Sequence, residues 1–585
     1  MRYTPRTIRR RPPQPIDHLP SHLHPVLRRI YAARNVGSAA ELDYSLERLH
    51  SYASLSGVEQ AARLLADGIR NGLRLMIIAD YDADGATACA LAMRGLKSMG
   101  AAQLDYLVPD RFRHGYGLSP EVADLAAAKA PDILVTVDNG ISSVQGAARA
   151  REAGMEVIIT DHHLPGDVLP SAGAIVNPNL PGDRFPSKNL AGVGVMFYVL
   201  AALRARLRES GWFTQRGLEE PNLAAFLDLV ALGTVADMVP LDANNRILVS
   251  HGLNRIRTGR CVAGLASLLA IAKRSRDRVT AADLAYFAGP RLNAAGRLTD
   301  MRLGIRCLLE DDPAEAARMA AELDSLNRQR REIQAQMQHE AMNELPDFQG
   351  SGGDLPPAIC IYKESWHAGV VGVLASQIKE RTQRPVIAFA REAEGLLKGS
   401  GRSVDGVHIR DILANIANAH PDLLIRFGGH AMAAGLSIAE DKLAVFSRLF
   451  EQEVGKCAFP AGAAGELLSD GELEAGELTL ETARIVKEAG PWGQAFPEPL
   501  FDGEFEVVSA RILGERHVKF GLALPGLARP LDAIAFNLAR AFDPEATGRV
   551  HLAYRLDVND YDGRRSVQLV VEAVIPVQEA VDGRR

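Results

Sequence analysis

Short apolar runs alternate with longer helical segments from residue 73 to residue 160. Continuous apolar runs separated by helices are typical of a parallel sheet with crossover helices, in which the strands are buried on both faces. The pattern predicts strands at 73–79, 103–109, 132–137 and 155–160, and helices at 85–100, 119–130, 142–154, 192–210 and 221–232.

The pattern changes twice further along the chain. Residues 313–345 have high helix propensity, charges throughout and no internal glycine or proline, which predicts one long helix. Its apolar stripe is thin, which favours a connector between lobes over a core helix. A second mixed region has expected strands at 358–362 and 385–390. Beyond residue 504 apolar and polar residues alternate with period two, which predicts a small antiparallel barrel or sandwich.

These changes predict the division of the chain. Its 585 residues are enough for about three or four domains. The first 20 residues are basic and proline-rich, and we expect a poorly ordered lead-in. Small-residue segments at 350–357 and 461–465 suggest linkers. The expected parts are a lead-in at 1–50, an α/β domain at 51–310, a connecting helix at 311–349, a second α/β domain at 350–460 and a barrel at 466–580.

Composition narrows the cellular context. Apolar residues make up 47% and charged residues 24%, which is ordinary for a globular protein. The five cysteines are scattered without a CxxC pair, which argues against a zinc knuckle or disulfide framework and fits a reducing cytosol. No apolar run is long enough to span a bilayer, and the N-terminus lacks the apolar core of a signal peptide. We therefore expect a cytoplasmic protein with no membrane partner.

Acidic and imidazole side chains follow several of the apolar runs. They are Asp80, Asp82 and Asp84 after the first predicted strand, Asp138 after the third, Asp161, His162 and His163 after the fourth, and Asp237 after a later apolar run. Sites in open α/β sheets form beyond the carboxyl ends of the strands, so these groups are expected at one rim. Carboxylates gathered in such number repel one another unless cations lie among them.

This cluster predicts a pair of divalent metal ions. Carboxylate ligands suit Mg²⁺ or Mn²⁺, and an imidazole favours Mn²⁺. Two metals roughly 3.5–4 Å apart activate a water and clamp a phosphoryl oxygen, so the expected reaction is phosphoester hydrolysis. The net charge of −6 argues mildly against a nucleic-acid partner, but acids that hold cations count as negative in that sum.

Each motif alone has a simpler interpretation. An isolated Asp-x-Asp is usually a turn or helix cap, and Asp-Asn-Gly is a turn. A second Asp-Tyr-Asp at 560–562 lies between two alternating runs, where a hairpin turn is expected. Only the joint occurrence of the first set in a βαβ series favours the metal site.

Ordered motifs give a specific resemblance. "DYDADG", "VDNG", "DHH" and "ALGTVADMVPL" resemble the DHH phosphoesterase superfamily. Six later motifs resemble, within it, the bacterial RecJ family of single-stranded-DNA-specific 5′→3′ exonucleases: "RFRHGYGLS", "GPRLNAAGRL", "WHAGVVGVLASQIKER", "LKGSGRS", "FGGHAMAAGLS" and "GPWGQAFPEPLF". The similarity runs from about residue 70 to the C-terminal barrel.

The resemblance implies an α/β protein with a DHH-type parallel-sheet domain, a long connecting helix, a DHHA1 α/β domain and a C-terminal OB-fold β-barrel. The implied activity is release of 5′-mononucleotides from single-stranded DNA in recombination and repair. It requires two divalent cations, Mn²⁺ or Mg²⁺. The implied partner is single-stranded DNA with a 5′ end, and a helicase and a single-stranded-DNA-binding protein are further candidate partners.

The resemblance also implies metal ligands, namely Asp80, Asp82, Asp84, Asp138, His162 and Asp237. Asp138 is the expected bridge because it follows the central strand. His163 orients the site or contacts the scissile phosphate, and Asp161 supports the histidines. Pyrophosphatase-like relatives carry a histidine at the position of Ile78, and Asp80 is its natural substitute here.

Residues that hold the DNA strand are expected mainly in the second region. Glycines in 397–403 and 427–437 are expected where backbone approaches a ligand, with tight turns as the alternative. A 5′-phosphate contact is assigned to Ser400 and Arg402, since arginine binds phosphate bidentately, and such an anchor explains 5′ polarity. The other candidates are His430 for the scissile phosphate, Arg111, Arg297 and Asn293 for the DNA backbone, Tyr116, Trp366 and His367 for base stacking, and Arg511, Arg516, His517 and Lys519 for contacts from the barrel.

Two other functions are compatible with parts of this pattern. Another DHH phosphoesterase, acting on short RNA or cyclic dinucleotides, would use the same metals but usually lacks the barrel. A non-catalytic, Cdc45-like scaffold would be expected to have lost acids from the site, whereas every expected acid is present.

Overall fold

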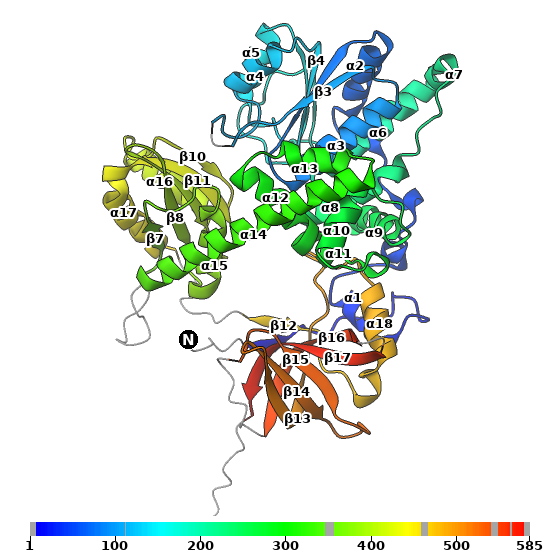
Figure 1. Ribbon diagram of the computed structural model, residues 1–585, viewed down its shortest axis with the longest axis vertical. Coiled ribbons are helices and arrows are strands. Elements are labelled where there is room, and N and C mark those ends of the chain that lie inside the picture. The colour runs from blue at the N-terminus through cyan, green and yellow to red at the C-terminus, as the bar shows by residue number, and fades with distance from the viewer. Residues whose placement is uncertain are drawn as a thin grey trace, which may run out of the picture. The chain divides into compact units, whose positions relative to one another are not determined.

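The computed structural model describes residues 7–111, 113–344, 356–457, 466–539, 548–561 and 564–577. The chain forms two compact units. The first consists mainly of Ile8–Leu326 and Leu468–Arg585, and the second mainly of Asn327–Leu467. Figure 1 shows the chain coloured from the N-terminus to the C-terminus. Most of the linkers expected at 350–357 and 461–465 lie outside the described residues.

A five-stranded parallel sheet forms the centre of the first unit, in the order β3-β2-β4-β5-β6. Its strands are β2 (Arg74–Ala79), β3 (Gln103–Leu107), β4 (Ile133–Val137), β5 (Glu156–Thr160) and β6 (Ala174–Val176). Every residue of β4 is buried, as expected for a central parallel strand. The predicted parallel sheet is confirmed, and only the three-residue β6 was missed.

Helices cover both faces of this sheet (Figure 1). Ile77 and Val135 belong to the main core, with α2 (Val58–Arg70), α3 (Ala83–Ser98) and α6 (Gly192–Glu209). The alternate positions Met76, Ile78 and Leu134 pack with α4 (Pro120–Ala127) and α5 (Val144–Glu152). This alternation is the two-residue period of a strand buried on both sides.

A helical layer completes this part of the unit. Its members are α7 (Trp212–Arg216), α8 (Leu227–Ala236), α9 (Ala243–Arg257), α10 (Ala263–Ile271), α11 (Ala281–Asp283), α12 (Gly289–Leu298) and α13 (Arg302–Leu309), with a π-helix at η6 (Leu284–Ala288) and short 3₁₀ turns at η4 (Leu223–Phe226) and η5 (Arg276–Arg278). Helix α8 is buried on almost all sides and packs against α3, α6 and α9.

The N-terminal segment packs into the first unit. It contains β1 (Ile8–Arg10), α1 (Pro25–Ala32) and 3₁₀ turns η1 (Ala39–Leu42), η2 (Leu46–Arg48) and η3 (Tyr52–Ser54), and β1 pairs with β12 (Leu467–Ser469). Arg34 forms a buried ion pair with Asp470 at 2.8 Å. The expectation that the first 20 residues are poorly ordered is therefore wrong for residues 7–20. The proline-rich start obscured an amphipathic helix whose Val26, Leu27 and Ile30 are buried.

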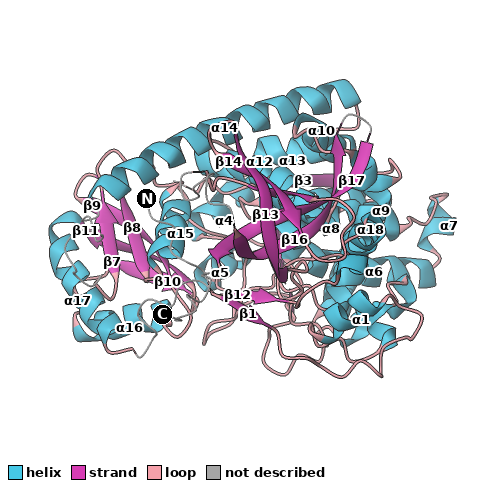
Figure 2. Cartoon of the chain, turned by 90° about the horizontal axis from the view of Figure 1, so that it is seen from below, coloured by secondary structure: helices cyan, strands magenta, loops and turns pink. Residues whose placement is uncertain are grey.

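A closed five-stranded barrel forms the C-terminal part of the first unit, in the order β13-β14-β15-β17-β16 (magenta in Figure 2). The strands are β13 (Phe501–Leu513), β14 (His517–Ala523), β15 (Leu531–Ala535), β16 (Arg549–Tyr561) and β17 (Arg564–Pro576); they are preceded by η8 (Ala475–Glu477) and α18 (Leu480–Glu488). The predicted OB-type barrel is confirmed. Tyr561 pairs with Arg564, which flanks the expected hairpin turn, but residues 562–563 of that turn lie outside the described part.

The second unit contains a mixed five-stranded sheet in the order β10-β11-β9-β8-β7. The strands are β7 (Ile359–Tyr362), β8 (Val386–Ala393), β9 (Leu396–Arg402), β10 (Arg426–Gly429) and β11 (Ala433–Ala439), and the helices are α15 (Val371–Thr382), α16 (Ile409–Ala419), η7 (Glu440–Lys442) and α17 (Leu443–Gly455). The predicted long helix is α14 (Pro313–Glu344), which begins in the first unit and continues in the second. No described helix is long and apolar enough to cross a membrane.

Candidate metal centre

The loop between β2 and α3 carries the first three acids. Asp82 caps α3, because its Oδ1 accepts hydrogen bonds from the amides of Asp84 and Gly85 at 2.9 and 3.0 Å. Asp80 is 4% exposed, and its Oδ1 accepts from the Tyr81 amide at 2.7 Å. The turn is so tight that a Cβ on Gly85 would lie 2.5 Å from the carbonyl oxygen of Asp80. This local geometry holds the three carboxylates close together.

Asp84 is fixed against the start of α6. Its Oδ2 accepts from the Gly192 amide at 2.6 Å, and its Oδ1 accepts from the Val193 amide at 3.0 Å. The positive end of a helix stabilises a carboxylate, but burial and the nearby charge of Asp82 dominate and raise the pKa of Asp84 to about 7. The protein therefore holds this acid in place at a substantial electrostatic cost.

Asp138 has an unusual backbone. Its φ of 61° lies in the left-handed region, which is uncommon outside glycine and costs free energy. The next side chain, Asn139, donates to the carbonyl oxygens of Ile78 and Val137 at 3.0 and 2.9 Å and so ties together the ends of β2 and β4. The strained residue is 2% exposed, and a Cβ on Gly192 would lie 2.4 Å from its Cβ. Packing from two directions therefore aims Asp138 at the rim.

Asp161 organises the two histidines that follow it. Its Oδ1 accepts from the amides of His162 and His163 and pairs with Nδ1 of His163 at 2.7 Å. Its Oδ2 accepts from the Ile141 amide at 2.9 Å. Burial alone would raise the pKa of Asp161, but the hydrogen bond and charge of His163 lower it below its ordinary value. With both oxygens engaged, Asp161 acts as a support for the histidines.

The pairing with Asp161 also raises the pKa of His163. Burial would lower its pKa, but the hydrogen bond and charge of Asp161 outweigh burial and raise it to about 9. The hydroxyl of Tyr116 lies 3.3 Å from Nδ1 of His163 and donates to the carbonyl oxygen of Asp138 at 3.2 Å. His163 is therefore an oriented imidazolium at neutral pH in this arrangement.

Asp237 reaches the rim from the end of a helix. The apolar run before it is α8, and Asp237 is the residue that ends this helix. Its Oδ2 lies 3.5 Å from Nε2 of His162, which is itself 3.1 Å from Oδ1 of Asp138. Burial, followed by the charges of Asp84 and Asp82, raises the pKa of Asp237 well above its ordinary value.

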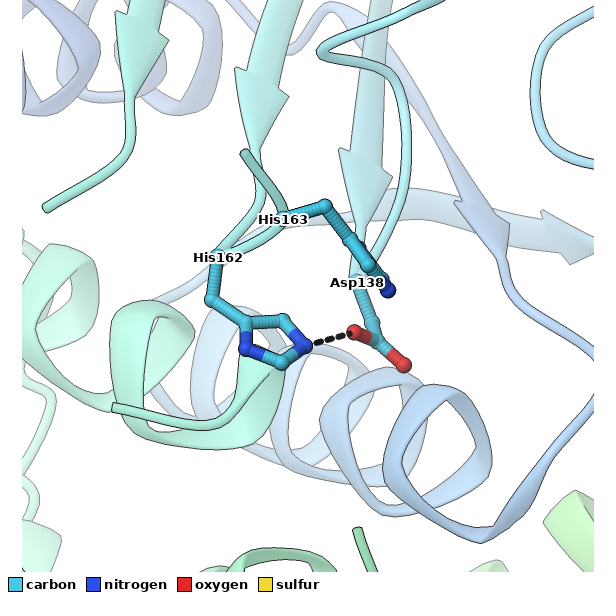
Figure 3. A group of neighbouring side chains, drawn as sticks. All are labelled: Asp138, His162 and His163. Carbon is cyan, nitrogen blue, oxygen red and sulfur yellow. Dashed lines mark ion pairs between the residues drawn. The ribbon is translucent and has the colours of Figure 1, made fainter. Parts of the chain in front are cut away.

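These residues form three overlapping groups in which the potential ligand atoms lie within 4.8 Å of one another. The groups are Asp138, His162 and His163 (Figure 3); Asp84, His162 and Asp237; and Asp80, Asp82 and Asp138. All six sequence-predicted ligands are thus brought together, and His163 joins them although Asp161 holds its Nδ1.

The donor set fits two divalent cations. Burial and mutual repulsion raise the pKa values of Asp80, Asp84, Asp138 and Asp237, so the cluster requires added positive charge. The buried Oδ1 of Asp138 accepts no hydrogen bond from the part of the chain that the structure describes. Carboxylate oxygens with the His162 imidazole suit Mn²⁺ or Mg²⁺. Asp138 and His162 each belong to two of these groups, and of the two only the carboxylate of Asp138 has two oxygens that could serve two metal positions.

Other predicted residues of the first unit surround this cluster. The guanidinium of Arg111 lies 4.8 Å from the centroid of the Tyr81 ring. In the sequence, Tyr81 stands between the first two acids of the loop. Asn293 accepts from the Ala83 amide at 2.8 Å, so it holds the acidic loop from α12, the helix that also carries Arg297. Tyr116 is 41% exposed, which keeps a stacking role open to it.

Ser400 and Arg402 lie beside the start of α15 in the second unit. Nη1 of Arg402 donates to Oγ of Ser400 at 3.2 Å, and a Cβ on Gly372, in the first turn of α15, would lie 2.9 Å from that Oγ. A hydroxyl and a guanidinium beside a helix N-terminus can bind an anion. His430 lies just after β10, where its amide donates to the Ala433 carbonyl at 2.7 Å.

Two expectations for this unit are wrong. A ligand is not needed to explain Gly399 and Gly401; they make room for core side chains, because a Cβ on them would lie 2.6 Å from Phe389 and 2.5 Å from Ile409. Trp366 is 4% exposed, so its ring is not available for base stacking. Its indole N–H donates to Glu340 of α14 at 3.0 Å, an anchoring role that motif position alone does not reveal. His367 is half-buried, and its Nδ1 accepts from the Gly369 amide.

Comparison with known proteins identifies the family. Models of the DHH family N-terminal domain, the DHHA1 domain and the RecJ OB domain match residues 74–234, 356–456 and 469–573. The single-stranded-DNA-specific exonuclease RecJ of Dickeya dadantii is 52% identical over 571 residues, which cover 97% of this chain and 99% of that protein. This chain belongs to the RecJ family.

Further RecJ proteins support the assignment. The RecJ of Escherichia coli is 51% identical over 97% of this chain and 99% of its own length. The crystal structure of Thermus thermophilus RecJ in complex with Mn²⁺ matches with a TM-score of 0.79 and 31% identity, covering 95% of this chain and 76% of that chain. The RecJ fold and the acid–imidazole cluster therefore occur together here.

Two functional residues escaped the sequence analysis. In this RecJ-family chain Asn177 donates to the carbonyl oxygen of His163 at 2.8 Å, and Asn179 donates to that of His162 at 2.6 Å. Both hold the histidine segment from the turn that follows the edge strand β6. The signal for them was the "NPN" turn after an apolar triplet too short to be predicted as a strand.

Proposed function

We propose that this chain is a single-stranded-DNA-specific 5′→3′ exonuclease that hydrolyses phosphodiester bonds and releases 5′-mononucleotides in DNA recombination and repair. One observation carries the proposal: all six acid and imidazole ligands converge at one rim in a chain 52% identical to a named exonuclease over 97% of its length. The substrate class follows from the family and the reaction type from the cluster.

The cluster would hold two divalent cations, Mn²⁺ or Mg²⁺, through Asp80, Asp82, Asp84, Asp138, His162 and Asp237. When bound, such a pair supplies an activated water and stabilises charge on the phosphoryl oxygens. Asp138, which is buried and belongs to two of the three groups, would contribute to both metal positions. Asp82 keeps Oδ2 for a metal while its Oδ1 caps α3.

The remaining residues position groups around the reacting phosphate. His163, which Asp161 holds in a fixed orientation, would donate a hydrogen bond to a phosphate oxygen. Arg111 and Arg297 neutralise phosphates of the strand, and Tyr116 or His367 stacks on a base. The roles of these residues are proposals that substitution can test.

We assign the 5′→3′ direction of cutting to residues of the second unit. Ser400, Arg402 and the N-terminus of α15 would bind the 5′-terminal phosphate, and His430 the scissile phosphate. An enzyme that anchors a 5′-phosphate begins from that end.

We also propose domain limits of 51–310, 311–349, 350–460 and 466–580, a cytoplasmic location suited to the five free cysteines, and a helicase and a single-stranded-DNA-binding protein as partners.

The alternatives fit less well. A hydrolase of short RNA or cyclic dinucleotides shares the metal cluster, but the barrel at 501–576 and its match to the RecJ OB domain favour a longer single strand. A scaffold protein has no need of buried acids whose mutual repulsion destabilises the metal-free site.

The test compares labelled substrates with Mn²⁺ or Mg²⁺. Substrates are 5′-labelled and 3′-labelled single-stranded DNA, duplex DNA and RNA, and the inactive control is Asp138→Asn, because asparagine tolerates a positive φ better than alanine. We expect mononucleotides to be released first from the 5′ end of single-stranded DNA, and not by the variant. Cutting of RNA alone, release from the 3′ end, or full activity of Asp138→Asn would contradict the proposal.

A further inference from the structure

A large arginine-lined cavity lies in the helical layer of the first unit, away from the acid–imidazole cluster. Its volume is about 1010 Å³, and it is lined by residues of α3, η4, α9 and α10, by the two loops that flank α10 and by the start of α14. Six of its lining residues are arginines: Arg94, Arg255, Arg257, Arg260, Arg274 and Arg276. None of its lining residues is a proposed metal ligand.

Four of these arginines are fixed by the protein itself. Arg94 pairs with Asp311 at 2.8 Å, and Nε of Arg257 donates to the carbonyl oxygen of Val279 at 2.9 Å. Nε of Arg255 lies 3.8 Å from Oδ1 of the buried Asp228. The guanidinium of Arg274 lies 3.6 Å from the centroid of the Phe287 ring. These contacts hold the cationic wall in a defined shape.

The other two arginines keep their charge available. Arg260 and Arg276 are exposed, and neither forms an ion pair with any residue in the described ranges. Nε of Arg260 donates only to the Thr258 hydroxyl, at 3.1 Å. Arg276 packs beside Gly259, where an added Cβ would lie 3.1 Å from its guanidinium. The cavity thus presents two adjacent, solvent-facing guanidinium groups on a protein with a net charge of −6.

Two further features place the cavity in the fold. Helix α10 lines it from Ala263 to Ala270, so the arginines lie around both ends of this helix. The loop that carries Arg276 is also joined to the barrel, because Arg278 pairs with Asp560 of β16. Barrels of this fold commonly bind single-stranded nucleic acid, and this ion pair links the loop to such a barrel.

We propose that this cavity is a second phosphate-binding site, separate from the metal centre, that takes the backbone of single-stranded DNA. Guanidinium groups bind phosphate oxygens bidentately, and the volume is at the upper end of small-ligand pockets, about 300–1,000 Å³, which leaves room for more than one nucleotide. A free mononucleotide offers the same phosphate chemistry and is the other source. The choice of nucleotides as ligands rests on the proposed exonuclease function.

The test removes the two available charges together. Full-length Arg260→Ala/Arg276→Ala is compared with Arg63→Ala/Arg216→Ala, which removes two exposed arginines of α2 and α7 outside the cavity. Binding of fluorescent long polythymidine is measured in EDTA over a salt series, so that it does not depend on cutting. We expect the affinity of the double variant to be about tenfold lower than that of the control pair. We also expect its slope of log affinity against log salt concentration to be smaller by about 1.4, roughly 0.7 for each phosphate that the variant no longer neutralises.

Further arms separate the possible ligands. Cutting of a very short oligonucleotide with Mn²⁺ is expected to be unchanged in the double variant, and thermal unfolding checks that it is folded. If dTMP competes with polythymidine for the wild type but not for the double variant, the site also takes free nucleotides.

Equal affinity and salt dependence in both pairs would overturn the proposal. Stronger competition by polyglutamate than by an oligonucleotide of equal charge would assign the cavity to an acidic protein partner and also overturn it. A protein that binds in this way but cuts nothing would refute the exonuclease and leave the second site standing.

Discussion

Replacing Asp161 with asparagine tests whether the histidines need an anionic support. In the wild type this buried side chain makes four polar contacts: with the amides of His162, His163 and Ile141, and with Nδ1 of His163. The asparagine side chain is nearly the same size as that of aspartate, so packing is preserved. The substitution removes one acceptor oxygen and the negative charge.

The cost follows from this geometry. If the asparagine carbonyl keeps the contacts to the histidine segment, its NH₂ group faces the Ile141 amide, and two buried donors oppose each other at a cost of about 1–3 kcal/mol. His163 also loses the group that raises its pKa to about 9, so its pKa falls and the imidazole loses charge at neutral pH. Supports of this kind change metal affinity or activity by about 10–100-fold, and we expect a loss in that range for Asp161→Asn.

The assay measures kcat, KM and the Mn²⁺ concentration for half-maximal activity on a short single-stranded substrate. The matched control is Asp502→Asn in the barrel: Asp502 is 1% exposed, pairs with a histidine (His551, 2.8 Å) and has a lowered pKa, yet has no contact with the cluster. Both variants should lose stability, but only Asp161→Asn should lose activity or metal affinity. Activity within about twofold of wild type at all Mn²⁺ concentrations would refute the supporting role.

Three further predictions concern the site and its framework. Gly192→Ala places a Cβ 2.4 Å from the Cβ of Asp138, so we expect activity to fall on the order of 100-fold with the fold retained by circular dichroism; normal activity would show that α6 does not fix Asp138. Arg34→Met leaves Asp470 buried without its 2.8 Å partner and should lower the free energy of unfolding in urea by about 3–5 kcal/mol, whereas an unchanged midpoint would mean that the N-terminal segment contributes little. Because the folded pKa of Asp84, about 7, is above its ordinary value of 3.8, the metal-free protein should lose stability as pH rises through that window, by up to about 1.4 kcal/mol per pH unit for each proton retained. Mn²⁺ should therefore raise Tm more at about pH 8 than at about pH 5, and an equal rise would contradict this sign.

The sequence predicted well those features that depend on local pattern. Buried strands β2, β4 and β5 are continuous apolar runs followed by acids, so both the sheet and the position of its polar rim could be anticipated. The long helix α14 was equally accessible, because its composition excludes helix breakers over its whole length. These signals lie within single segments.

Features that depend on contacts between distant segments could not be predicted. Nothing near Asp470 in the sequence indicates its buried partner Arg34, 436 residues away. The glycines of β9 have the same local appearance whether a ligand or Phe389 occupies the space beside them. Trp366 was expected to stack on bases, and only the position of Glu340 on another helix shows why it is buried. Tertiary packing decided each case.

The two Asp-Tyr-Asp motifs illustrate why strand context determines chemistry. In the first, Asp80 and Asp82 follow a buried parallel strand, and burial, followed by the charge of Asp82, raises the pKa of Asp80 well above its ordinary value. In the second, Asp560 lies near the end of an antiparallel hairpin strand, pairs with Arg278 and Arg565, and has a lowered pKa. The same three residue types therefore form an electrostatically unfavourable cluster in one place and a neutralised pair in the other. Only the first stores the repulsion that a bound cation would relieve, which is why it, and not its copy, belongs to the proposed metal centre.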